Sequence, residues 1–252
     1  MEPGHVFRVD ADGDAGAIRA ALESLEADII VRPPDAPFPR LFVADMDATM
    51  ITVECIDELA DYAGVKPQVA EITERAMRGE LDFEAALEAR VKLLAGLDAE
   101  VLRRCYDERV RIMPGAEILV RTLKARGCRT VLVSGGFTAF ADRVAAEIGF
   151  DAAHSNVLGV SEGRLDGTVA EPILGAEAKL RTLEREAREL DRLATVAVGD
   201  GANDIPMLQA AGLGIAYHGK PAVVAAADAA IRYGDLTAIV HGLGIPRAEW
   251  VG

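Results

Sequence analysis

Positive charge is scarce in this chain. Its 252 residues contain 27 Lys and Arg against 41 Asp and Glu, which gives a formal net charge of −14. A chain this acidic repels both nucleic-acid phosphates and anionic membrane surfaces. No run of Lys or Arg interrupts this balance, so we expect neither nucleic acid nor a membrane as a partner. An anionic small molecule would require a local positive pocket.

Long apolar runs and paired cysteines are also missing. No apolar stretch reaches the roughly 18 residues of a membrane span, and residues 1–4 lack the basic and apolar regions of a signal peptide. The three cysteines, Cys55, Cys105 and Cys128, are scattered and form no C-x-x-C pair. An odd number of scattered cysteines is typical of reduced thiols. These absences predict a cytoplasmic protein.

Apolar residues, in contrast, make up 50% of the chain, which is enough for a real core. Leu41 to Ala44 are predicted to form a buried strand, because a run that is apolar on both faces is typical of a parallel sheet covered by helices. Asp45 and Asp47 follow this strand, at the sheet edge where ligands bind in α/β folds. Two buried carboxylates repel each other, so a cation should lie between them, and oxygen ligands suit Mg²⁺. The plainer alternative is a strand that ends in a polar turn.

The chain is predicted to have an α/β fold, with a Rossmann-like three-layer parallel sheet as its core. Some sixty residues of helical pattern stand between the first core strand and the next one, and a segment of that length predicts a lid rather than a loop. The first forty residues predict a strand–helix–strand extension (5–9, 14–25 and 28–31) and a Pro-rich linker. The expected parts are therefore the extension (1–40), the catalytic core (41–50 and 112–252) and a helical cap (51–111).

Three later stretches carry further polar groups. Ser134-Gly135-Gly136 lies between a predicted strand and a helix, where exposed backbone N–H groups suit a phosphate, although an ordinary turn is the alternative. Lys179 lies beside the apolar stripe of a helix that begins at Ala176, and a solvated surface lysine is the alternative. The turn 199–204 ends another buried strand and contains Asp200, Asn203 and Asp204, the last of which is also a plausible helix cap.

Together these residues suit phosphoryl transfer, a reaction that needs positioning and charge neutralisation more than elaborate covalent chemistry. A carboxylate held against phosphorus can act as the nucleophile and form an aspartyl-phosphate. A second carboxyl group, two residues further on, can protonate the leaving alcohol and then activate water.

Arg90 is unusual because it shares one face of a predicted helix with Phe83, Leu87 and Leu94. Its apolar stem can lie on that face with the charged head in water. Alternatively, its guanidinium group holds an anion, and the planar fork suits a carboxylate.

The sequence resembles the haloacid dehalogenase superfamily of phosphatases and, within it, the phosphoserine phosphatase family. The superfamily's four motifs appear in order as Asp45-Met46-Asp47-Ala48-Thr49, Ser134-Gly135-Gly136, Lys179 and Gly199-Asp200-Gly201-Ala202-Asn203-Asp204. The narrower family is indicated by residues 52–60, by residues 77–83 and by Arg90, seven residues after Phe83. The resemblance covers residues 41–235.

The resemblance implies a Mg²⁺-dependent phosphatase that hydrolyses O-phospho-L-serine to L-serine and phosphate through an aspartyl-phosphate, as the last step of serine biosynthesis. Asp45 would be the nucleophile and Asp47 the general acid and base. Mg²⁺ would be held by Asp45, the backbone carbonyl of Asp47 and Asp200, with Asp204 next to these ligands but not bound to the metal.

The resemblance also implies how the substrate is bound. The phosphate would be held by Ser134, Gly135, Lys179 and Asn203. Glu54 would bind the substrate ammonium group and Arg90 its carboxylate, while Met77 and Phe83 close over the bound molecule. An acid and a base together fit a zwitterionic amino acid, because either would be costly to enclose unpaired.

Other functions stay open at this point. A phosphotransferase of the same fold, acting for example on homoserine, or a phosphatase for another small phosphoester would use the same motifs. A non-catalytic phospho-acceptor switch and a metal-binding interaction module are two further classes, but a switch needs neither a helical lid nor Lys179. Relatives often have a longer regulatory domain than these forty residues, so regulation by serine is undecided, and a homodimer is left open.

Overall fold

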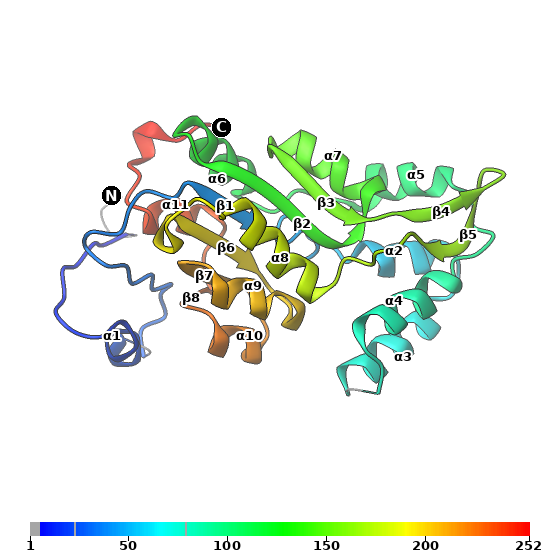
Figure 1. The fold of residues 1–252 in the computed structure, drawn as a ribbon, viewed down its shortest axis with the longest axis horizontal. Helices are drawn as coiled ribbons and strands as arrows, with labels where there is room; N and C mark the ends of the chain where they lie inside the picture. The colour runs from blue at the N-terminus through cyan, green and yellow to red at the C-terminus, as the bar shows by residue number, and fades with distance from the viewer. Residues whose placement is uncertain (1–5, 23, 79) are drawn as a thin grey trace.

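The computed structural model describes residues 6–22, 24–78 and 80–252, except for the side chain of Met77. Its centre is a six-stranded parallel sheet with the strand order β3-β2-β1-β6-β7-β8 (Figure 1). The strands are β1 (Leu41–Ala44), β2 (Arg129–Phe137), β3 (Ala152–Asn156), β6 (Thr195–Gly199), β7 (Leu213–Tyr217) and β8 (Ala229–Ile231). The predicted fold class is confirmed.

Apolar side chains leave β1 on both faces of the sheet, which explains why its whole sequence is hydrophobic. Phe42 and Ala44 belong to one buried cluster, and Leu41 and Val43 belong to the other. Because successive side chains of a strand point to opposite faces, each face needs its own covering layer. The strand ends where the sequence turns polar, at Asp45.

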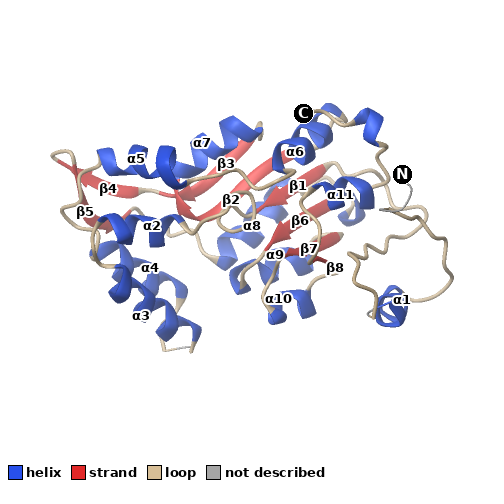
Figure 2. Ribbon diagram, turned by 180° about the vertical axis from the view of Figure 1, so that it is seen from behind, coloured by secondary structure: helices blue, strands red, loops and turns tan. Residues whose placement is uncertain are grey.

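Helices cover both faces of this sheet (Figure 2). One layer contains α6 (Ala116–Ala125), α7 (Thr138–Ile148) and α11 (Thr237–Gly242), and the other contains α8 (Ala176–Glu186), α9 (Ile205–Ala210) and α10 (Pro221–Ala226). Leu183, Met207 and Val223 from the second layer pack against Leu41 and Val43. The core therefore has the three layers that the sequence predicted.

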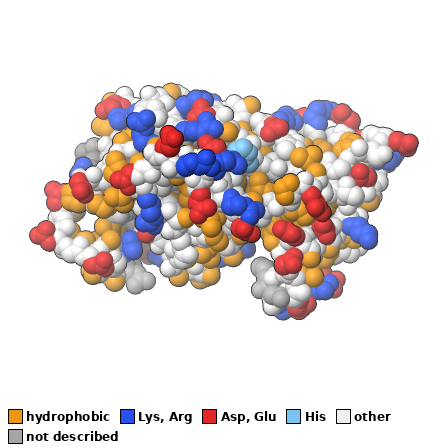
Figure 3. Space-filling view, in the orientation of Figure 1, with side chains coloured by type: hydrophobic (Ala, Val, Ile, Leu, Met, Phe, Trp, Pro, Cys, Tyr) orange, Lys and Arg blue, Asp and Glu red, His pale blue; other side chains and the backbone are white. Residues whose placement is uncertain are grey.

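The segment between β1 and α6 forms four helices at one end of the molecule, which together are called the cap. They are α2 (Cys55–Tyr62), α3 (Lys66–Met77), α4 (Phe83–Lys92) and α5 (Glu100–Arg109). The chain enters and leaves the cap side by side, because Ile51 pairs with Ile112 and the Thr52 N–H donates to the Arg111 carbonyl at 3.0 Å. Figure 3 shows the lobe of α3 and α4 projecting from the surface, with an indentation between it and the core.

A hairpin of β4 (Leu158–Ser161) and β5 (Arg164–Val169) extends from the core to the cap. The Gly96 N–H donates to the Leu165 carbonyl at 2.8 Å, and the Leu165 N–H donates to the Leu97 carbonyl at 2.9 Å. A further bridge joins Asp98 to Arg164. The hairpin thus braces the segment between α4 and α5.

The N-terminal extension differs from the prediction. Its helix is present as α1 (Ala15–Leu22), but residues 6–9 form no strand, and His5 lies outside the described residues. Phe7 and Val9 are 78% and 79% exposed, so their alternation does not reflect a sheet partner. The second predicted strand is reduced to a single bridge between Ile29 and Ala230, on the free edge of β8.

In the part of the chain that the structure describes, no helix combines the length and the apolar character needed to cross a bilayer. Cys55, Cys105 and Cys128 are all buried and free of disulfides.

Candidate active site

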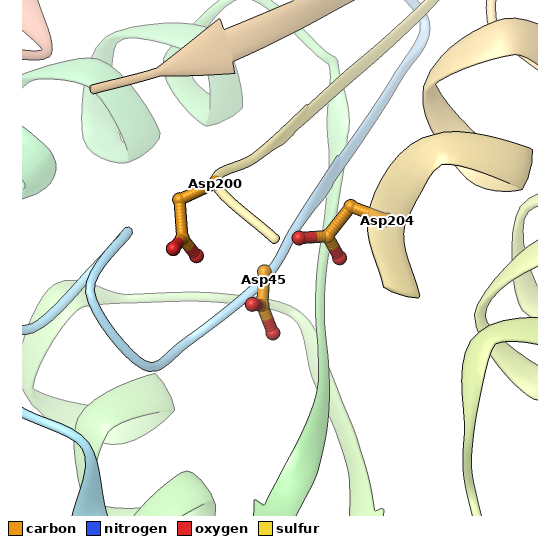
Figure 4. A group of neighbouring side chains, drawn as sticks. All are labelled: Asp45, Asp200 and Asp204. Atoms are coloured by element: carbon orange, nitrogen blue, oxygen red, sulfur yellow. The ribbon is translucent and has the colours of Figure 1, made fainter. Parts of the chain in front are cut away.

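The acidic residues predicted at the strand ends meet at one edge of the sheet. Asp45 follows β1 and Asp200 follows β6, and these two strands are neighbours in register. Asp204 comes from a short 3₁₀ helix (Ala202–Asp204) that leads into α9. Figure 4 shows the three side chains next to one another, and each offers an oxygen within 4.8 Å of those of the other two.

Lys179 lies inside this cluster rather than on the surface. It comes from the first turns of α8, and its side chain is fully buried. Its Nζ lies 2.6 Å from Asp45 Oδ1 and 2.7 Å from Asp204 Oδ1. A charged amine is buried only with close partners, so the two carboxylates explain its position, and the alternative of a solvated lysine is excluded.

The cluster contains more acid than base. Burial and the charge of Asp204 raise the pKa of Asp45 well above its usual range, and the same two causes raise the pKa of Asp200 to about 6. Burial by itself would lower the pKa of Lys179, but Asp204 and Asp45 more than offset this effect and raise it. The excess of negative charge adds to the effect of burial on the acids, because a single ammonium group cannot neutralise three neighbouring carboxylates.

Backbone and hydroxyl donors hold the other acid oxygens. Asp204 Oδ2 accepts from the Gly201 N–H at 3.0 Å, and Asp200 Oδ1 accepts from the Thr49 hydroxyl at 3.3 Å. Gly199 leaves room for Asp204, since a Cβ at that position would lie 2.4 Å from its Cγ. Both oxygens of Asp204 are therefore engaged, by Lys179 and by Gly201.

Asp47 faces the Ser-Gly-Gly segment. A Cβ on Gly136 would come within 2.8 Å of Asp47 Oδ2, so only glycine allows this approach. Asp47 Oδ1 accepts a 3.2 Å hydrogen bond from the Cys55 N–H, at the start of α2. Burial raises the pKa of Asp47, and the hydrogen bond from Cys55 partly opposes this rise. Ala48 next to it has a left-handed backbone with φ of 51°, which is unfavourable for a residue with a Cβ.

Ser134, Gly135 and Gly136 form an outward bulge in β2. The register with β3 pairs Val133 with His154 and then Phe137 with Asn156, which leaves more residues on β2 than on its partner. Within the bulge the Gly136 N–H donates to Ser134 Oγ at 2.8 Å. A hydroxyl group that accepts in this way still has its own proton to donate, which is useful toward an anion.

The cap reaches the site through several side chains. Phe83, the first residue of α4, lies against Gly135 and Gly175, where an added Cβ would lie 2.9 Å from its Cζ and 2.8 Å from its Cδ1. Arg90 is half-buried and donates through Nε to the Ala86 carbonyl at 3.1 Å, and it forms no ion pair with any described residue. Burial lowers its pKa, whereas the charges of Asp57, Glu54 and Asp47 raise it.

Glu54 lies between the acidic cluster and the cap, directly before α2. Its side chain is exposed by surface area, yet enclosure by protein and the charges of Asp47, Asp200 and Asp57 raise its pKa to about 8. A side chain meets both conditions when protein and other acids surround it on several sides and water reaches it on one. Carboxylates from both parts of the molecule thus face a common space.

The remaining predicted residues are less closely placed. Asn203 is half-buried in the 3₁₀ helix beside Asp204, with its Oδ1 close to the Gly201 backbone. Met77 ends α3, and its side chain lies outside the described residues. Sequence reasoning assigned no role to Thr49, Cys55 or Gly136. Thr49 and Gly136 at least belong to recognised motifs, but nothing in the sequence marks the Cys55 N–H as a donor.

The donor set suits a hard divalent cation. All the converging ligand atoms are carboxylate oxygens, which Mg²⁺ and Ca²⁺ prefer. The excess of negative charge, visible in the raised pKa values of Asp45 and Asp200, is of the sign that such a cation would neutralise. The acidic cluster therefore fits a metal ion.

Three comparisons with known proteins agree. A family model of haloacid dehalogenase-like hydrolases matches residues 42–209. A phosphoserine phosphatase of Archaeoglobus fulgidus is 44% identical over 249 residues, which cover 95% of this chain and 72% of the relative.

Solved structures give the same result. An unliganded probable phosphoserine phosphatase from Vibrio cholerae matches with a TM-score of 0.80 at 42% identity, covering 92% of this chain and 73% of that one. A phospho-aspartyl intermediate analogue of phosphoserine phosphatase matches with a TM-score of 0.76 at 39% identity, covering 83% of this chain and 100% of that one.

Proposed function

Because the chain belongs to the haloacid dehalogenase-like hydrolases and, within them, to the phosphoserine phosphatase family, we propose that it hydrolyses O-phospho-L-serine to L-serine and phosphate. The observation that carries this proposal is the contact of Asp45 with buried Lys179 at the carboxyl edge of the sheet, beside Asp200 and Asp204. A strand-end carboxylate paired with a buried cation and surrounded by further acids suits phosphoryl transfer.

Asp45 is the nucleophile of the first step. A carboxylate oxygen attacks phosphorus, the bond from phosphorus to the serine oxygen breaks, and an aspartyl-phosphate forms on Asp45. The departing serine oxygen takes a proton from the Asp47 carboxyl group. The raised pKa of Asp47 supports this role, because burial favours its protonated form.

Asp47 then acts as the base of the second step. Its carboxylate removes a proton from a water molecule, whose oxygen attacks phosphorus, and the bond to Asp45 breaks to release phosphate. The N–H of Cys55 holds the Asp47 carboxylate in place during both steps, and the absence of a side chain at Gly136 leaves room for it.

The phosphate group is held by Ser134, the Gly135 N–H, Lys179 and Asn203. Lys179 already contacts Asp45 and therefore lies beside any phosphate bonded to it. Backbone N–H and hydroxyl donors in a fixed arrangement stabilise the charge that develops on the phosphoryl oxygens.

Mg²⁺ is the proposed cofactor, held by Asp45, the backbone carbonyl of Asp47 and Asp200. When bound, it neutralises negative charge on the phosphate and on the carboxylates. Asp204 is proposed to orient this set rather than to bind the metal, because Lys179 and Gly201 already engage both of its oxygens.

The cap supplies the recognition of the amino acid. Arg90 has no charged partner among the described residues and faces a group of acids, so we assign it the substrate carboxylate. Glu54 receives the ammonium group, and Met77 and Phe83 close over the substrate. Phe83 already contacts Gly135 of the phosphate segment, which supports a closed arrangement.

The test compares phosphoserine with phosphoethanolamine, which has the ammonium group but no carboxylate. With Mg²⁺ we expect phosphate release from phosphoserine, none with chelator, and a kcat/KM lower by roughly 10- to 100-fold for phosphoethanolamine. Arg90→Met should remove this preference while keeping turnover of phosphoethanolamine. Equal turnover of both substrates by the unaltered enzyme would contradict the proposal, and phosphorylated homoserine in an assay with added homoserine would indicate a phosphotransferase.

A further inference from the structure

Asn156 joins two segments of the phosphate site that are far apart in the sequence. It is the last residue of β3 and is 2% exposed. Its Nδ2 donates to the Gly135 carbonyl at 2.9 Å and to the Leu174 carbonyl at 3.1 Å, and its Oδ1 accepts from the Leu174 N–H at 2.7 Å. Both donors of the amide are thus used, together with one of its two acceptor sites.

On one side, Asn156 orients a peptide group of the bulge in β2. The Gly135 carbonyl and the Gly136 N–H belong to one planar trans peptide unit, so they point in opposite directions. Holding the carbonyl toward Asn156 therefore directs the Gly136 N–H toward Ser134 Oγ, which it reaches at 2.8 Å. Ser134 is left with its own proton free for an acceptor.

On the other side, Asn156 holds the chain just before α8. Leu174 precedes Gly175, the N-cap of that helix, and the first helical turn is closed by the Lys179 N–H donating to the Gly175 carbonyl at 3.1 Å. Gripping both backbone groups of Leu174 sets where α8 begins, and thereby where Lys179 enters the acidic cluster.

We propose that Asn156 is a positioning residue of the phosphate site, which sets the distance between Ser134 and Lys179 by holding the Gly135 and Leu174 carbonyls together. The inference rests on the proposed function only in assuming that these two side chains bind phosphate. Nothing in the sequence indicates this role, because it depends on three separate segments meeting at one amide.

The test uses Asn156→Asp, which keeps the shape of the side chain but removes its two N–H donors. Asn156→Ser, which has a smaller side chain, keeps the test possible if the first variant folds poorly. Ser155→Ala is the matched control, since Ser155 precedes Asn156 in the same strand and its buried Oγ has no hydrogen-bond partner among the described residues. Inorganic phosphate is titrated calorimetrically into each protein with Mg²⁺ present, and kcat and KM for phosphoserine are measured separately.

We expect both Asn156 variants to weaken phosphate binding and to lower kcat/KM by roughly 10- to 100-fold, while Ser155→Ala behaves like the unaltered protein. In a Ser134→Ala background the loss caused by Asn156→Ser should shrink by at least about 3-fold, because the part that acts through Ser134 is already absent and only the part that acts through Lys179 remains. A lower melting temperature with unchanged phosphate affinity, or an undiminished loss in that background, would overturn the inference.

The two proposals fail separately. If the unaltered protein does not turn over phosphoserine but binds inorganic phosphate, the proposed substrate is wrong, and the phosphate titrations still decide the role of Asn156. If phosphoserine is hydrolysed and the Asn156 variants bind phosphate normally, only the inference is wrong.

Discussion

At the scale of single residues, Lys179 is the side chain on which the acidic cluster depends. It is fully buried and contacts two carboxylates at 2.6 and 2.7 Å. Removing one partner of a buried ion pair is costly because the other charges stay enclosed without compensation.

Replacing Lys179 with Met should therefore destabilise the protein by roughly 3–5 kcal/mol in the presence of chelator. With Mg²⁺ the loss should be smaller, because a divalent cation at the same acids partly replaces the missing charge. Urea denaturation of both proteins, with Mg²⁺ and with chelator, measures the two differences. An equal loss under both conditions would show that no cation binds at these acids, and Lys124→Met, on the surface, serves as the control.

Sequence reasoning found the charged members of the site but not the groups that orient them. Asp45, Asp200 and Lys179 each have an ordinary structural explanation when taken singly, and they were predictable only because the whole set suits phosphoryl transfer. The contacts of Asp47 with Gly136 and with the Cys55 N–H were not, since close approach and backbone direction depend on the tertiary fold.

At the scale of elements, the first residue of α4, Phe83, packs against two glycines of the core. Phe83 lies so close to Gly135 and Gly175 that a Cβ at either position would displace it. Gly175 has φ of −114°, which other residues adopt easily, so its substitution tests packing rather than backbone strain.

Gly175→Ala should push Phe83 away and hinder the approach of α4, lowering kcat/KM by about 10-fold. Phe83→Leu should lower it as well, but the double variant should lose less than the sum of the two in free energy, because the smaller side chain removes the clash. Steady-state kinetics on all four proteins measure this coupling. Strictly additive losses in free energy would mean that residues 83 and 175 do not interact.

Elements with strong periodicity were predicted well, and those without a partner were not. The buried strand at Leu41–Ala44 is where the sequence indicates it. Residues 6–9 alternate like a strand but have no neighbouring strand to complete a sheet, and pattern alone cannot reveal that. The docking of the hairpin on the cap was equally invisible, because most of its hydrogen bonds join backbone groups, which the sequence does not mark.

At the scale of the whole molecule, the N-terminal extension contributes little to the core. None of the residues of α1 is buried, and the firmest link to the core is Asp28, whose carboxylate accepts from the N–H groups of Arg232, Tyr233 and Gly234 at 2.6, 3.1 and 2.7 Å.

Deleting residues 1–27 should therefore leave kcat/KM within about 2-fold and lower the melting temperature by no more than about 3 °C. Asp28→Ala in the full chain, which removes the three accepted bonds, should cost more, about 2 kcal/mol or roughly 4–8 °C in melting temperature. Thermal melts and kinetics on both proteins check this order. A greater loss from the deletion would mean that the extension packs more tightly than its exposure indicates.

The surplus of acid also predicts how stability depends on pH. A raised pKa in the folded state, such as the value of about 8 for Glu54, means that the folded protein holds protons that the unfolded chain has already released. With chelator, the free energy of unfolding should therefore fall as the pH rises from about 7 to about 8, a window above the unfolded titration of His.

Urea denaturation across this window measures the slope, and Glu54→Gln should flatten it. Mg²⁺ should flatten it too, because a bound cation favours the deprotonated acids. A rise in stability over the same window would contradict the assignment of surplus acid to this site.

The brace between the hairpin and the cap limits the ways in which the enzyme can admit its substrate. The hydrogen bonds from the N–H groups of Gly96 and Leu165 tie the hairpin to the segment between α4 and α5. An opening of the cap that preserves these bonds therefore moves the hairpin together with the cap. The hairpin joins the core at Asn156, the last residue of β3, and the chain returns to the core near Leu174, just before α8, so a motion of this kind would turn at these two connections. Substrate entry is then coupled to the Asn156 amide, which sets the distance between Ser134 and Lys179.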